Sequence, residues 1–150
     1  MALRLLHTND LHGQFKKPLL PALVEARSKV DLYFDSGDCV KAGNLAVPLK
    51  PEKAWKRLAA AGCDLSCLGN RETHVLPGPF HKKLEGASHP VICGNMFAKD
   101  GGPVLPSHQT FEVNGLRVVA FSVMVAMVTE RMATQAASAY LWEQPIEAAK

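Results

Sequence analysis

Residues 3–15, LRLLHTNDLHGQF, change from a short apolar run to a polar loop. The run at 3–7 has the length and composition of a buried strand, and Asp10 and His12 follow it. In an extended segment, side chains two residues apart point the same way, so Asp10 and His12 can reach one cation. Gly13 then frees the backbone for a tight turn. The first loop is therefore a candidate metal-binding segment.

The same change from apolar to polar recurs along the chain and alternates with segments of helical pattern. Such alternation is typical of βαβ units around a mostly parallel sheet, so we predict an α/β fold. Asn114-Gly115 lies between two apolar runs and predicts a hairpin with a type I′ turn. The predicted strands are 3–7, 32–35, 65–68, 91–93, 109–113 and 116–123, and the predicted helices are 19–28, 52–61 and 80–84.

The segment 52–61 carries the clearest helical signals. Pro51 suits a first helical position, and Trp55 and Leu58 recur on one face, which we assign to the core. Gly62 can end the helix in a left-handed conformation. We therefore expect a well-defined amphipathic helix here.

The length of 150 residues, with 47% apolar and 21% charged residues, suits one compact domain and excludes a disordered chain. No internal repeat or linker divides it. Residues 145–150 resemble the opening turn of another helix. We expect residues 1–150 to form one domain that is part of a longer protein.

The charge pattern excludes several classes of partner. The formal net charge is +3, and no block of like charges indicates a dedicated binder of nucleic acid or anionic membrane. The longest apolar stretch, 118–128, is shorter than the roughly 20 residues of a membrane helix. Residues 1–6 lack the features of a secretory signal, which predicts a cytoplasmic location unless a signal was removed. The four cysteines contain no Cys-x-x-Cys pair, which favours reduced structural thiols over a zinc site or disulfides.

Polar side chains also follow the second and third predicted strands. Right-handed crossovers bring the carboxyl ends of parallel strands to one edge, so we expect the three loops to converge there. Their carboxylate, imidazole and amide donors suit manganese, zinc, iron or magnesium rather than copper(I). From the residues alone, a solvated loop with Asp10 as a helix N-cap is equally consistent. The other residues concerned are Asp35, Asp38, Asn70, Arg71, Glu72 and His74.

Three segments resemble motifs of the calcineurin-like metallophosphoesterases, most closely of their 5′-nucleotidase branch. They are HTNDLHG at 7–13, FDSGD at 34–38 and GNRE at 69–72, in the order of the family. A looser similarity extends over ICGNMF at 92–97 and GLRVVAFSV at 115–123. The resemblance implies the metallophosphatase-type α/β/β/α sandwich, of which this chain would supply roughly the first half.

The resemblance also implies two divalent metal ions and assigns their ligands. Asp10 and His12 match ligands of the first metal, and Asp38 matches the carboxylate that bridges both. Asn70 matches a ligand of the second metal. In such a site the two cations clamp the phosphoryl oxygens and activate a water that attacks phosphorus.

Two residues depart from the family pattern. Arg71 stands where the family usually has histidine, and its guanidinium can hold a phosphate oxygen but cannot transfer a proton. His74 stands where the 5′-nucleotidase branch has aspartate, and its imidazole would recover that catalytic proton transfer. The downstream Gly-His-x-His block of the family has no match among the six histidines. We therefore expect weak metal binding by this chain alone.

From the resemblance we predict a metal-dependent phosphoester hydrolase that takes part in nucleotide catabolism. Its substrate would be a nucleotide or a related small phosphoester, with neither nucleic acid nor a membrane as partner. The alternative is a non-catalytic half-domain or degenerate relative that binds a partner or a nucleotide without turnover. Metal content and hydrolysis of a chromogenic phosphoester distinguish the two.

Other polar and aromatic residues are given structural roles. His7 is expected to make a structural hydrogen bond, and Asp35 to cap a turn or to orient a neighbour of the ligands. Tyr140 and Trp142 would lie on an uncovered apolar surface, which predicts self-association. The residues expected in solvent are Lys16, Lys17, His81, Lys82, Lys83, His89 and His108.

Overall fold

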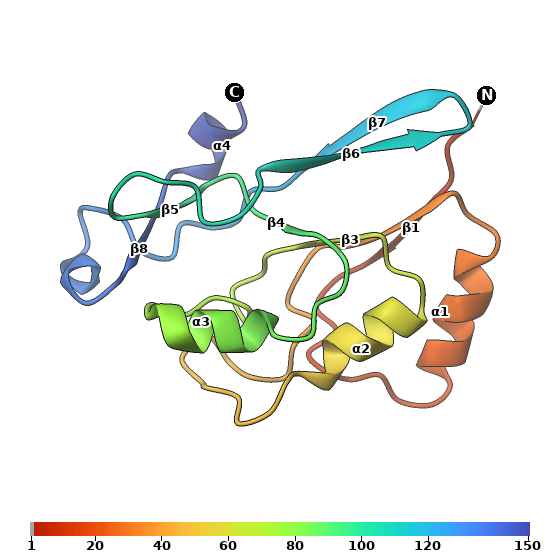
Figure 1. Ribbon diagram of the computed structural model, residues 1–150, viewed down its shortest axis with the longest axis horizontal. Coiled ribbons are helices and arrows are strands. Elements are labelled where there is room, and N and C mark those ends of the chain that lie inside the picture. Colours follow the sequence, from red (N-terminus) through yellow and green to blue (C-terminus); the bar gives the residue numbers. More distant parts are fainter. Residues whose placement is uncertain (1) are drawn as a thin grey trace.

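A four-stranded parallel sheet forms the centre of the protein, whose computed structural model describes residues 2–150 (Figure 1). Its strand order, β1-β2-β3-β4, is the same as the order along the chain. The sheet confirms the predicted α/β fold with parallel strands. The four strands are β1 (Leu5–Thr8), β2 (Leu32–Asp35), β3 (Leu65–Cys67) and β4 (Val91–Ile92).

Three helices lie on the same face of this sheet (Figure 1). This follows from the strand order, because each right-handed crossover leads to the next strand in the same direction. Within the described part of the chain the longest helix has nine residues, and none is long and apolar enough to cross a membrane. The helices are α1 (Leu19–Arg27), α2 (Lys53–Ala60) and α3 (Pro77–Leu84).

Helix α2 anchors the core between the helices and the sheet. Trp55 and Leu58 are fully buried, as predicted, and the Trp55 indole donates a hydrogen bond to a backbone carbonyl of α3 at 2.7 Å. The helix begins at Lys53 with Glu52 as its N-cap, so the predicted place of Pro51 within the first turn is wrong. Gly62 has φ 76° and follows the helix end, as predicted.

The β6–β7 hairpin lies across the parallel sheet from the helices, and the antiparallel pair β5–β8 lies beyond one end of the sheet, next to α3 (Figure 1). The predicted hairpin is confirmed, since Asn114 and Gly115 have φ values of 52° and 75°. Phe111 of this hairpin packs against Phe34 of the sheet, with ring centroids 5.4 Å apart. The remaining elements are β5 (Met96–Ala98), β6 (His108–Val113), β7 (Leu116–Phe121), η1 (Ala133–Ala136), β8 (Tyr140–Trp142) and α4 (Pro145–Ala148).

The prediction that Tyr140 and Trp142 are uncovered is wrong. Both lie in β8, which pairs with β5, and they are only 5% and 4% exposed. Phe80 of α3 packs edge-on against Tyr140, with ring centroids 5.2 Å apart. The predicted self-association therefore loses the surface on which it was based.

The prediction that Lys83 is solvated is also wrong, because its side chain is fully buried. It lies one helical turn after Phe80, on the face of α3 that packs inward. Its ammonium group connects a loop that is distant in the sequence, at 43–44, with the segment 71–73 just before α3. It donates hydrogen bonds to the carbonyl oxygens of Gly43 at 2.7 Å, Asn44 at 2.9 Å, Arg71 at 2.7 Å and Thr73 at 2.7 Å.

The histidines expected in solvent divide into two groups. His81 and His108 are exposed, as predicted. His89 is partly buried instead, with its Nε2 2.8 Å from the Ser66 hydroxyl and its ring edge-on to Trp55. A polar partner inside the fold accounts for this difference.

The cysteines behave as structural thiols. All four are free, and Cys39, Cys63 and Cys93 are buried. Burial raises the pKa of Cys63 to about 12 and that of Cys93 to about 11, so both remain protonated near neutral pH.

The Lys83 ammonium is expected to be a major contribution to stability. In Lys83→Met the four buried carbonyl oxygens lose their donor, and we expect the free energy of unfolding to fall by about 3–5 kcal/mol. Urea denaturation measures this loss. The matched control is Lys82→Met, whose side chain is partly exposed and paired with Glu85, with an expected loss below about 1 kcal/mol. Equal losses in the two variants would contradict the assigned role.

Candidate metal centre

The loops that follow β1 and β2 run side by side and are fixed by backbone hydrogen bonds. The Asp10 amide donates to the Gly37 carbonyl at 3.1 Å, and the His12 amide donates to the Asp38 carbonyl at 2.9 Å. The Gly13 amide continues the pattern to the next carbonyl at 2.7 Å. These bonds place Asp10 and His12 beside Asp38, as the convergence of strand ends predicts.

The backbone of this cluster is left-handed. Asp10, His12 and Asp38 have φ values of 54°, 48° and 55°. Such values cost on the order of 1–2 kcal/mol for each L-residue. The extended conformation predicted for Asp10 and His12 is therefore wrong, and the turns together with the hydrogen bonds between the loops bring the side chains together.

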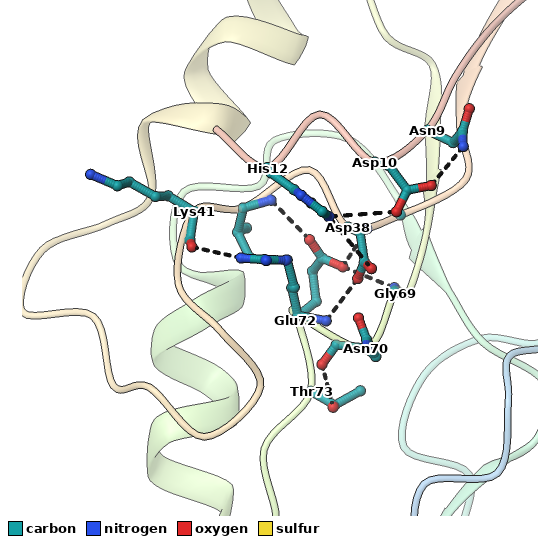
Figure 2. Close-up of polar contacts among 12 residues, drawn as sticks. Asn9, Asp10, His12, Asp38, Lys41, Gly69, Asn70, Glu72 and Thr73 are labelled. Atoms are coloured by element: carbon teal, nitrogen blue, oxygen red, sulfur yellow. Dashed lines mark hydrogen bonds and ion pairs between the residues drawn. The ribbon is translucent and has the colours of Figure 1, made fainter. Parts of the chain in front are cut away.

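Asp10, His12 and Asp38 point toward one another in Figure 2. The His12 Nε2 atom lies 3.5 Å from Asp10 Oδ1 and 3.9 Å from Asp38 Oδ2. One donor atom from each of the three residues lies within 4.8 Å of the others. The side chain of Asp10 is 59% exposed and that of Asp38 is 19% exposed, so Asp38 forms the inner side of the cluster.

Two atoms that could ligate a metal have no hydrogen-bond partner among the described residues, and this supports the fit of these residues to a divalent cation. His12 Nε2 and Asn70 Oδ1 are buried and have no hydrogen-bond partner within the described structure. Buried polar atoms are nearly always paired, and a metal ion is one of the partners that can satisfy them. In Figure 2 the Asn70 side chain points toward Asp38. The carboxylate, imidazole and amide donors match the ligand types of manganese, zinc, iron and magnesium.

Glu72 holds the loops after β2 and β3 together. Its buried carboxylate accepts backbone N–H groups from Asp38 at 2.8 Å, Val40 at 3.1 Å and Gly69 at 2.9 Å. Burial raises the pKa of this carboxyl, while the three N–H groups favour its charged form. The sequence placed Glu72 in the polar loop but gave no sign that its role is to bind the backbone.

Arg71 lies beside the cluster through both its backbone and its side chain. Its amide donates to Asp38 Oδ1 at 2.7 Å, and its guanidinium Nη1 donates to the Lys41 carbonyl at 3.0 Å. The guanidinium is therefore anchored next to the loop that carries Asp38. This position suits the predicted contact with an anion.

The structure does not bring His74 into this cluster. His74 lines a separate cavity of about 180 Å³ with Asn44 and Trp142. Its Nδ1 accepts the Leu76 amide at 2.9 Å, and burial together with the charge of Lys83 lowers its pKa. The role of His74 in proton transfer stays a prediction, and the position of His74 does not support it.

His7 and Asp35 have the structural roles that were considered for them. His7 Nε2 lies 2.6 Å from the Ser36 hydroxyl. The buried Asp35 accepts hydrogen bonds from the Gly37 amide at 3.1 Å and the Thr8 hydroxyl at 2.6 Å. Burial raises the pKa of Asp35 to about 6. Asp35 thus closes the turn that leads to the cluster.

A cavity of about 410 Å³ adjoins the cluster and offers space for a ligand. Asp10 and Asp38 lie in its wall beside Cys67, Ser122 and Met124. Sequence reasoning missed Cys67 and Ser122 as lining residues, because each lies in or next to an apolar run with no local polar signal. They are brought to the cavity by β3 and by the segment after β7.

Comparison with curated proteins finds relatives that are longer than this chain. The chain is 31% identical over 139 residues to an uncharacterized metallophosphoesterase, YunD, of Bacillus subtilis (strain 168), which matches 82% of this chain and 29% of that protein. It is 26% identical to a 5′-nucleotidase of Vibrio vulnificus (strain CMCP6), covering 81% of this chain and 25% of the relative. The chain therefore spans between a quarter and a third of these relatives. No family model matches the sequence.

Comparison with solved structures confirms the metallophosphatase-type fold. NAD nucleotidase of Haemophilus influenzae matches 98% of this chain with a TM-score of 0.72 and 17% identity, over 30% of its own length. The calcineurin-like phosphoesterase YfkN of Bacillus subtilis matches 98% with a TM-score of 0.73 and 16% identity, over 55% of its length. This chain has the fold of a part of these proteins.

Gly69 is expected to tolerate no side chain. A Cβ atom there would lie 2.2 Å from the Asp38 nitrogen and 2.4 Å from its Oδ1, so the backbone around Asp38 must move. We expect Gly69→Ala to lower the free energy of unfolding by about 2 kcal/mol or more in urea denaturation. Gly78→Ala is the control, because a Cβ at Gly78 has open space, and its expected effect is within about 1 kcal/mol. A variant Gly69→Ala as stable as this control would contradict the close packing.

Proposed function

We propose that this chain supplies metal ligands to a phosphoester hydrolase. The chain belongs to the calcineurin-like metallophosphoesterases of the 5′-nucleotidase type and corresponds to part of their length. The proposed substrate is a nucleotide or a related small phosphoester. The observation that carries the proposal is the cluster of Asp10, His12 and Asp38, whose donor atoms lie within 4.8 Å of one another. The unpartnered Nε2 of His12 supports it.

The proposed ligands divide between two divalent cations, which would be manganese, zinc, iron or magnesium. Asp10 and His12 would hold the first cation, Asn70 would hold the second, and Asp38 would contribute to both. The inner position of Asp38 between the two loops supports this shared role. When bound, such cations clamp phosphoryl oxygens and lower the pKa of a water that attacks phosphorus.

Arg71 is the proposed contact for a phosphate oxygen of the substrate. Its guanidinium is anchored by the Lys41 carbonyl near Asp38, and it presents further N–H donors in a planar fork. The guanidinium stays charged at any pH of interest, so Arg71 binds and orients the phosphate but transfers no proton. A catalytic role for His74 remains a prediction from the sequence.

One observation supports a second candidate function, which is binding without catalysis. His74 lines a separate cavity and Arg71 cannot titrate, so neither of the two residues that depart from the family pattern offers a proton donor beside the cluster. The chain would then bind a metal and a phosphoester without turnover. Hydrolysis of a chromogenic phosphoester in manganese distinguishes this binding module from the hydrolase.

Asp38→Asn tests the metal ligands directly. We expect manganese affinity, measured by isothermal titration calorimetry, to fall by at least about 100-fold. Mutation of a residue that only hydrogen-bonds to a metal ligand already lowers metal affinity by about 10–100-fold. Any manganese-dependent hydrolysis of a chromogenic phosphoester should be lost as well. The control is Asp100→Asn, which removes a carboxylate in an exposed turn and should leave affinity unchanged. Unchanged manganese binding in Asp38→Asn would refute the assignment.

A further inference from the structure

Two neighbouring hollows lie next to the loop that carries His12 and Gly13. The first, of about 500 Å³, is lined by His12 together with Lys16, Lys41 and Arg57. The second, of about 310 Å³, shares Gly13, Lys41 and Arg57 with the first and adds Lys50 and Lys53. Because three residues line both of them, the two hollows lie side by side, and we call this surface the basic groove. We define this groove by its basic residues, Lys16, Lys41, Lys50, Lys53 and Arg57.

The basic groove concentrates the positive charge of the chain. It has five basic residues and one acid, Glu52, which leaves twelve basic and thirteen acidic residues elsewhere. The rest of the chain thus has a formal net charge of −1. Within the described structure none of the five basic side chains forms an ion pair with a carboxylate. An uncompensated cluster of this kind attracts anions.

Arg57 and Glu52 give the basic groove a fixed wall. The Arg57 guanidinium lies over the Phe15 ring, 5.6 Å from its centroid, and donates to the Gly13 carbonyl at 3.4 Å. Glu52 accepts the backbone amides of Lys41 at 3.3 Å and Ala42 at 2.9 Å. Its carboxylate is therefore engaged with the backbone, and Arg57 keeps unused N–H donors at the wall that both hollows share.

The basic groove leads away from the metal centre. His12 belongs to both, since it lines the first hollow and lies 3.5 Å from Asp10. In Figure 2 the Lys41 side chain lies on the other side of His12 from Asp10 and extends away from the carboxylates. Arg71 joins the two regions through its hydrogen bond to the Lys41 carbonyl. His12 is thus the residue at which the centre and the groove meet.

We infer that the basic groove binds a second phosphate group of the substrate, so that the preferred substrates are small phosphoesters with two phosphates. This inference rests on the proposed function for the first phosphate, which lies at the metal centre. Arg57 and Lys41 are the principal contacts of the second phosphate, because they line both hollows. A doubly charged phosphate gains charge-assisted hydrogen bonds there that a neutral group would not.

The test compares adenosine 5′-monophosphate with adenosine 3′,5′-bisphosphate, which differ by one phosphate. Calorimetric titrations of the whole chain are run with manganese, where the first phosphate can occupy the metal centre, and again in EDTA, where it cannot. We expect the bisphosphate to bind about tenfold more tightly, and its affinity to weaken as salt is added. Arg57→Gln and Lys41→Gln should each reduce this preference by about threefold or more. Lys56→Gln removes a nearby exposed charge that lines neither hollow and should leave the preference unchanged.

The outcomes separate this inference from the proposed function. Equal affinities for the two nucleotides, no binding of either, or a preference that survives in both Arg57→Gln and Lys41→Gln would overturn the inference. So would an equal loss in Lys56→Gln, because it would reflect surface charge in general. Adding manganese should tighten both nucleotides if the metal centre binds phosphate. If manganese has no effect while the preference in EDTA persists, the proposed function fails and the phosphate-binding groove stands.

Discussion

The carboxylate of Glu72 is the contact on which the rest of the site depends. It accepts hydrogen bonds from three backbone N–H groups of two loops. These bonds hold the backbone of Asp38 in its left-handed conformation. Gly69 lies so close to Asp38 that the two loops can meet only without a side chain there. The functional groups of the candidate centre are therefore positioned by a buried carboxyl group that binds the backbone of the loops.

Much of the fold follows from local signals in the sequence. The alternation of short apolar runs and helical segments predicts the parallel sheet, and Asn114-Gly115 predicts the hairpin, because these signals act within a few residues. The gathering of Asp10, His12 and Asp38 also follows, since parallel strands end at one edge. The backbone conformation of Asp10 and His12 does not follow, because hydrogen bonds to the neighbouring loop determine it.

What the sequence could not predict depends on contacts between distant segments. Lys82 and Lys83 look alike in the chain, yet one is partly exposed and the other binds four carbonyl oxygens inside the fold. The burial of Trp142 depends on its pairing with β5, some 45 residues earlier. His74 lies close to Asn70 in the sequence, but its ring is directed into another cavity. In each case the direction of a side chain is set by tertiary packing.

The strand order has a consequence for how the protein forms. Each strand of the parallel sheet pairs with the strand that precedes it in the chain, so the sheet can grow from β1 while the polypeptide is still leaving the ribosome. Pairing of β1 with β2 brings Asp10 and His12 beside Asp38, and the arrival of β3 delivers Glu72. The residues of the centre are thus brought together by pairings that need none of the strands after β3.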